Sequence, residues 1–142
     1  MSGMPAVMPL SLVIFDCDGV LIDSEGLCNR VVAEMLTETG WALTTEACQT
    51  LFIGLTFADT QRAAEAHLMR SLGTDWVDRV VERVTAVMAA EALPIPGAWQ
   101  AVEAVAAAGL PFRVASNSSH EEMAAKFACT GFDRLIPADR IH

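Results

Sequence analysis

The stretch VIFDCDGVLIDSE, residues 13–25, decides the fold. The apolar run from Leu12 to Phe15 leads directly into Asp16 and Asp18, and Gly19 follows. Short continuous apolar runs are typical of strands that are covered on both faces, as in a parallel sheet. Because residues i and i+2 of a strand point to the same side, Asp16 and Asp18 are predicted to project together from its carboxyl end, where open α/β sheets bind ligands.

Two carboxylates this close repel each other unless one is protonated or a cation lies between them. Mg²⁺ prefers hard oxygen ligands and commonly accompanies substrate phosphates. Gly19 permits a backbone turn that other residues disfavour. An exposed acidic turn without a ligand is the other interpretation, but the pattern as a unit favours a site for Mg²⁺ and phosphate at Asp16 and Asp18.

Four helices are predicted between residues 25 and 93, because apolar residues recur there at helical spacing. The second is expected over residues 45–52 and the third over residues 57–72, before Gly73. Asp75 precedes the fourth as a candidate N-cap.

A hinge is predicted at LPIPG, residues 93–97, where two prolines and a glycine interrupt the pattern. After it we expect a helix over residues 98–108 and a strand over residues 112–116. A capping-box pattern at Ser118 or Ser119 then opens a helix that ends near residue 130.

This order predicts an α/β fold with two parts. The first is a partial doubly wound, Rossmann-like parallel-sheet core, residues 9–24 and 94–142. The second is an inserted four-helix cap domain, residues 25–93, which leaves the core just after the acids. We therefore expect the cap to form a lid over Asp16 and Asp18.

Composition limits the classes of function. The chain has 142 residues, of which 53% are hydrophobic, and a formal net charge of −9, which argues against nucleic-acid or anionic-membrane binding. The four cysteines form no CxxC pair, so free thiols are expected rather than a zinc site. No basic segment precedes the first apolar stretch and no apolar run approaches about 20 residues, so we expect a cytoplasmic protein.

The stretch FDCDGVLIDSE resembles the first signature of the haloacid dehalogenase-like hydrolases, in their phosphatase and sugar-phosphate mutase branch. PIPG at the return of the cap and VASNSS on the next strand follow in the family's order. The resemblance implies that Asp16 is a nucleophile that forms an aspartyl-phosphate, and that Asp18 is the general acid and then the general base. It further implies that the Asp16 carboxylate and the Asp18 backbone carbonyl hold Mg²⁺.

The VASNSS segment supplies candidate phosphate ligands. Ser116 offers a hydroxyl, Asn117 an amide, and the following helix free backbone N–H groups. By resemblance, Ser116 binds the transferring phosphoryl group, and we add Asn117 and Gly19 to the phosphate site. Ordinary N-capping is the alternative, and we assign that to Ser118 or Ser119.

The cap segment LFIGLTFADT, residues 51–60, resembles the family stretch that selects substrates, so Thr56 and Phe57 are candidate substrate-binding residues. Phe57 stands where the mutases tend to carry an arginine, and Cys28 stands near where they carry a histidine. Both departures favour hydrolysis over phosphate transfer within the sugar. Packing within the cap is the alternative reading of Phe57.

Two parts of the family pattern are missing: a later lysine motif and later metal-binding acids. Lys126 is the single lysine and is expected to be a solvated helix residue; Asp133 and Asp139 are poor candidates for the late acids. We therefore expect either a fragment of a longer protein or a truncated gene product.

The expected function is Mg²⁺-dependent hydrolysis of a small, sugar-phosphate-like metabolite by a monomer or homodimer. A sugar-phosphate mutase, or an inactive fragment that only binds metal or phosphate, are the alternatives. Asp23 is expected to cap the first cap helix or to hydrogen-bond at the hinge rather than to act in catalysis.

Overall fold

A computed structural model describes residues 9–142. The expectation that the N-terminus is not a signal peptide rests partly on residues 1–8, which lie outside the described residues. The fold is α/β, as predicted, with six α-helices among the described residues. The elements run β1 Val13–Asp16, β2 Ile22–Asp23, α1 Glu25–Glu38, α2 Thr45–Phe52, α3 Phe57–Leu68, α4 Trp76–Glu91, β3 Leu93–Pro94, α5 Ala98–Ala107, β4 Phe112–Ala115 and α6 His120–Thr130, followed by 3-10 helices at Phe132–Arg134 and Ala138–Arg140.

A two-stranded parallel sheet fixes the position of the acids. β1 pairs with β4 in a register that places Val13 opposite Phe112 and Asp16 opposite Ala115. Both strands therefore end at the same edge of the sheet, with Asp16 beside the start of the serine-rich loop. The parallel pairing agrees with the apolar run that precedes Asp16.

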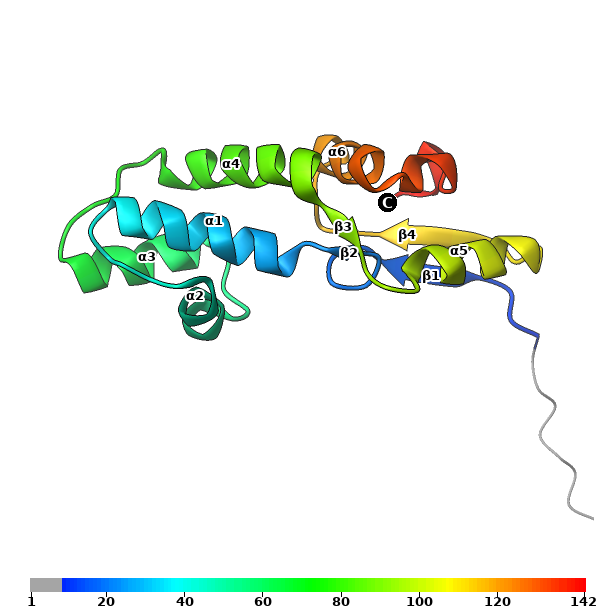
Figure 1. Ribbon diagram of the computed structural model, residues 1–142, viewed down its shortest axis with the longest axis horizontal. Helices are drawn as coiled ribbons and strands as arrows, with labels where there is room; N and C mark the ends of the chain where they lie inside the picture. The colour runs from blue at the N-terminus through cyan, green and yellow to red at the C-terminus, as the bar shows by residue number, and fades with distance from the viewer. Residues whose placement is uncertain (1–8) are drawn as a thin grey trace, which may run out of the picture.

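The helices α1–α4, called here the helical cap, extend away from the carboxyl ends of β1 and β4 (Figure 1). The chain enters the cap through β2 and leaves it through β3, and these two short strands pair antiparallel, with Asp23 opposite Leu93. The sequence predicted a hinge at this place but not the pairing. The pairing of β2 with β3 holds the segment that enters the cap against the segment that leaves it.

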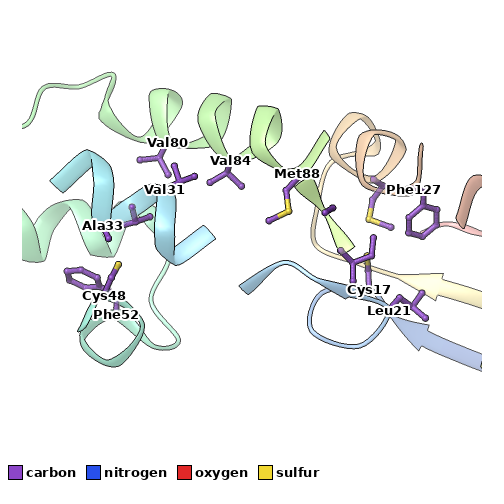
Figure 2. Packing of buried hydrophobic residues seen from close by; sticks show 14 of the residues in the cluster. Cys17, Leu21, Val31, Ala33, Cys48, Phe52, Val80, Val84, Met88 and Phe127 are labelled. Atoms are coloured by element: carbon purple, nitrogen blue, oxygen red, sulfur yellow. The ribbon is translucent and has the colours of Figure 1, made fainter. Parts of the chain in front are cut away.

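The apolar stripe of α4 packs the helices of the cap together. Trp76, Val80, Val84 and Met88 recur every four residues and are buried, at 0 to 6% exposure. This face of α4 packs against α1, and α4 also contacts α6 (Figures 1 and 2). Burial of a stripe of this kind supplies most of the stability of such helices.

Two local predictions need correction. The third helix ends at Leu68 rather than at residue 72, because Met69 adopts a left-handed conformation, with φ of 54°, and stops it. Asp75 does precede α4, but its side chain makes no capping hydrogen bond and pairs with Arg79 instead, at 3.2 Å. Within residues 9–142, every helix is too short or too polar to cross a membrane.

Candidate active site

A tight turn after β1 presents Asp16 and Asp18. The Cys17 carbonyl accepts hydrogen bonds from the backbone N–H groups of the three residues that follow Gly19, at 2.9 to 3.3 Å. Gly19 has φ of 73°, a left-handed conformation that few other residues adopt readily, as the sequence predicted. Cys17 is fully buried while the residues on either side of it are exposed. Both aspartates therefore face away from the core.

The Asp18 carboxylate is the centre of a hydrogen-bond cluster. Its Oδ1 accepts from Lys126 Nζ and from Ser24 Oγ, each at 2.7 Å. Its Oδ2 accepts from the hydroxyls of Ser116 and Ser118, each at 3.3 Å. The cluster therefore joins the end of β1, the entry to the cap, the loop after β4 and helix α6.

Lys126 is not the solvated helix residue that the sequence suggested. Its side chain is only 6% exposed, and besides Asp18 it donates a hydrogen bond to Ser118 Oγ at 2.8 Å. Lys126 shares the buried face of α6 with Met123 and Phe127, at helical spacing. A buried ammonium needs a charged partner, and Asp18 is that partner.

The surroundings of Asp18 keep its carboxylate ionised. Burial alone would raise its pKa, but the hydrogen bonds from Lys126 and Ser24, together with the positive charge of Lys126, outweigh burial and lower it. The Asp18 side chain is still 40% exposed, so it remains accessible from the solvent side.

Asp16 is held differently. Its Oδ1 accepts a hydrogen bond from the backbone N–H of Cys17 at 2.7 Å, and within residues 9–142 no other donor reaches this carboxylate. An exposed carboxylate with free lone pairs can attack an electrophile or coordinate a cation. Asp16 and the Asp18 carbonyl offer hard oxygen donors of the kind that Mg²⁺ uses together with water and substrate phosphate. Among the described residues no group of three or more His, Cys, Asp or Glu side chains gathers to complete such a site.

The loop after β4 is shaped by its own serines. Ser118 donates its backbone N–H to Ser116 Oγ at 3.0 Å, which fixes the Ser116 hydroxyl beside Asp18. Ser119, one of the two serines predicted to cap, does cap α6, in a reciprocal capping box with Glu122. Ser118 instead turns its hydroxyl to Asp18, and Asn117 faces the cavity described next.

A cavity of about 610 Å³ lies between Asp18 and the cap. Asp18, Gly19, Asn117 and Lys126 line its end at the sheet, and α1, α2 and α4 supply most of the opposite wall. The cap therefore covers the cavity beside Asp18, whereas Asp16 and Ser116 do not line this cavity.

Thr56 and Phe57, the candidate substrate-binding residues of the cap, differ in their positions. Phe57 lines the cavity and also packs against the core. The Thr56 hydroxyl caps α3, accepting from the Asp59 N–H at 3.1 Å and donating to the Asp59 carboxylate at 2.6 Å. Thr56 is not among the lining residues. Asp23 lies in β2, and within residues 9–142 no hydrogen bond reaches its carboxylate, so it does not cap α1.

Three members of the cluster were missed in the sequence: Ser24, Ser118 and Lys126. Lys126 could have been found because it falls on the same helical stripe as Met123 and Phe127 and is the single lysine of the chain. Nothing local distinguishes Ser24 or Ser118, since their contacts to Asp18 depend on the tertiary fold.

The comparisons with known proteins agree with this geometry. The family model described as "Hydrolase: haloacid dehalogenase-like hydrolase" matches residues 10–141. No curated protein matches the chain.

Several solved structures share the fold. A haloacid dehalogenase-like protein of unknown function from Agrobacterium tumefaciens superposes with a TM-score of 0.81 and 25% identity, over 94% of this chain and 59% of that one. A HAD family hydrolase from Deinococcus radiodurans, solved with bound phosphate and sodium, gives 0.75 and 30%, over 94% and 58%. A HAD hydrolase of family IA, variant 3, from Entamoeba histolytica gives 0.72 and 20%, over 93% and 60%.

This chain therefore spans about three fifths of the length of these relatives. The match of the family model covers nearly the whole chain and includes both aspartates, the serine loop and the cap. The chain belongs to the haloacid dehalogenase-like hydrolases.

Proposed function

We propose that this chain carries the reacting aspartates of a Mg²⁺-dependent phosphomonoester hydrolase that acts on a small phosphorylated metabolite. The observation that carries the proposal is the contrast between the two acids. Asp16 is exposed and accepts one hydrogen bond, whereas Asp18 is held by Lys126 and three serines at the same edge of the sheet. One acid is free to react and the other is positioned to exchange protons.

In the first step, an Asp16 carboxylate oxygen attacks phosphorus and the bond from phosphorus to the substrate's ester oxygen breaks. The departing oxygen takes a proton from Asp18. In the second step, the Asp18 carboxylate removes a proton from a water molecule as that water attacks phosphorus. The bond from phosphorus to Asp16 breaks, which yields inorganic phosphate and restores both acids.

Mg²⁺ bound by the Asp16 carboxylate and the Asp18 carbonyl would neutralise negative charge on the transferring group. The chain's own donors for the phosphate are Ser116, Asn117 and the N–H groups of the serine loop. Lys126 adds a cation at the same place.

Asp18 must be protonated in the first step although its pKa is lowered in the structure. The donors that lower it, Lys126 and the serines, are also those that a phosphate dianion attracts. A bound phosphate that takes these donors from Asp18 leaves a carboxylate beside negative charge, and both changes raise its pKa. The ionised Asp18 of the structure is the form required for the second step.

A phosphate-binding unit with little turnover is a second candidate. The metal ligands in residues 9–142 are few, and the chain covers only 58 to 60% of the related chains.

The proposal also includes a division into a core, residues 9–24 and 94–142, and a cap domain, residues 25–93. The doubly wound sheet would then be completed by strands additional to β1 and β4.

Phosphate release from a panel of phosphomonoesters, with Mg²⁺ and with EDTA, tests the proposal. Wild-type protein is expected to release phosphate only with Mg²⁺, and Asp16→Asn to abolish release. Asp23→Asn is the matched control, because it removes an exposed acid from the same segment without touching the cluster. Equal release by wild type and Asp16→Asn would refute hydrolysis by this route. Binding of inorganic phosphate without turnover would favour the second candidate.

A further inference from the structure

We propose that the substrate of this site is a phosphate monoester whose organic part is uncharged and mainly apolar, bound with that part against the cap wall of the cavity. The inference rests on the proposed function for the phosphate end and goes further in assigning the chemical class of the rest of the molecule.

The cap wall is mainly apolar, although the uncharged polar side chains of the cap that line it are Asn29, Gln49, Thr60 and Thr85. Phe52 and Cys48 of α2 and Val84 and Met88 of α4 line the cavity, and all four are buried, at 0 to 9% exposure. Hydroxyl-rich ligands need hydrogen-bonding groups, because a polar group buried without a partner costs free energy. An aliphatic or aromatic body needs none.

Apolar side chains also stand at the rim of the cavity. Ile53 is 74% exposed and Leu55 is 46% exposed, and both line the cavity from the segment between α2 and α3. Large apolar side chains clustered beside a pocket mark a surface that gains free energy when it is covered. A substrate whose body extends from Asp18 toward the rim covers Ile53 and Leu55.

The charges of the cavity exclude a second anionic group. Among residues 9–142, the charged residues that line it are three acids, Asp18, Glu25 and Glu122, and one cation, Lys126. Lys126 lies at the phosphate end and is paired with Asp18 at 2.7 Å. The cap wall therefore offers no cation to a second phosphate or to a carboxylate, and Glu25 repels either.

The two cysteines of the wall add to its apolar character. Burial raises the pKa of both the Cys28 and the Cys48 thiol to about 11, so both are neutral at physiological pH. The cavity, about 610 Å³, is within the range of small-molecule sites and leaves room beyond the phosphate for an organic group.

The test is a series of n-alkyl phosphates from methyl to hexyl, compared with glucose 6-phosphate and a hexose bisphosphate under identical Mg²⁺ conditions. The inference predicts that kcat/KM rises about threefold to fourfold with each methylene group until the cavity is filled. Both sugar compounds are expected to fall below butyl phosphate. A preference for either sugar compound would overturn the inference and leave the hydrolase proposal standing.

Binding of the corresponding alkylphosphonates, followed by calorimetry, separates the two proposals, because phosphonates bind without being hydrolysed. Affinity that rises with chain length while no ester is turned over would refute the hydrolase and support the apolar site. Affinity independent of chain length would refute the apolar site.

Two variants test whether the rim of the cavity produces the dependence on chain length. The double variant Ile53→Ser, Leu55→Ser is expected to flatten the dependence on chain length. Leu51→Ser is the matched control, since Leu51 lies nearby at the end of α2 and is 52% exposed but does not line the cavity. An equal loss in both variants would show that the rim does not contact the substrate.

Discussion

Replacing Lys126 by methionine removes the one cation that lines the cavity in the described part of the chain, while keeping a side chain of similar length on the buried face of α6. The substitution deletes the hydrogen bonds to Asp18 and to Ser118, at 2.7 and 2.8 Å. Hydrogen bonds that involve a charged group contribute roughly 1.5–3 kcal/mol each. Removing a buried ammonium also relieves its desolvation, and Asp18, at 40% exposure, can recover a partner from water.

The net loss in free energy of unfolding at pH 7 is therefore expected to be about 1–2 kcal/mol. This loss of stability is expected to be larger at neutral pH than at acid pH. The pKa of Asp18 is lowered in the folded state, so the stabilisation is fully present above the pKa of an unfolded aspartate. As the pH falls below about 4 and through the folded pKa, Asp18 takes up a proton and the difference between the proteins shrinks.

Urea unfolding followed by tryptophan fluorescence, at pH 7 and at about pH 3.5, measures both quantities. Arg83→Met is the matched control. It removes an ion pair of the same length, 2.7 Å to Glu38, whose side chains are 46% and 56% exposed, and is expected to cost no more than about 0.5 kcal/mol. A loss at Lys126 that equals the control, or that does not change with pH, would show that Lys126 contributes packing rather than charge.

Three further predictions concern the cap. Met88→Ala should lower the free energy of unfolding by about 2–4 kcal/mol in urea titrations, because the Met88 side chain of α4 is only 1% exposed. A loss below about 1 kcal/mol would contradict that packing. Gln49→Arg adds a cation to the exposed cap end of the cavity and should strengthen binding of a bisphosphate up to about fivefold by calorimetry, with Thr50→Arg, one residue away and outside the cavity, unchanged. Alkylation of Cys28, followed by mass mapping, should accelerate about tenfold per pH unit from pH 7 to about 10, because burial raises its pKa to about 11; a plateau near pH 8.5 would mean an ordinary thiol.

The elements whose signal is local could be predicted from the sequence. The apolar run before Asp16, the stripe of α4 and the capping box at Ser119 each express a period or a spacing that the backbone imposes. The range predicted for α2 agrees with the structure. The third helix was predicted four residues too long, because the left-handed turn at Met69 has no glycine to mark it.

The arrangement of the site could be predicted only in part. Asp16, Asp18 and Ser116 were predicted from their places at or just after the ends of strands, and the structure brings these strand ends to one edge of the sheet. Lys126 was misread because a single charged residue on a helix is usually solvated, and its burial depends on Asp18, which lies 108 residues away in the sequence. Contacts of this kind arise from the register of β1 against β4 and from the packing of α6, which no local pattern specifies.

The pairing of β2 with β3 was missed for a similar reason. Two residues on each side form a ladder, and Pro94 cannot donate a hydrogen bond, so this segment resembles a linker rather than a strand. It forms because the ends of the cap meet at one point of the core.

The central claim is that Asp16 forms a covalent phosphoryl intermediate while Asp18 exchanges protons. The most direct measurement is acid-quenched peptide mass mapping of the Asp18→Asn variant after incubation with Mg²⁺ and p-nitrophenyl phosphate. This leaving group departs without a proton, so the first step proceeds, and the lost base slows the second. The account predicts that a phosphoryl group accumulates on Asp16 in Asp18→Asn beyond its level in wild type, and that Asp16→Asn acquires none. A phosphoryl group on Ser116 or Ser118, or none on the peptide that contains Asp16, would contradict it.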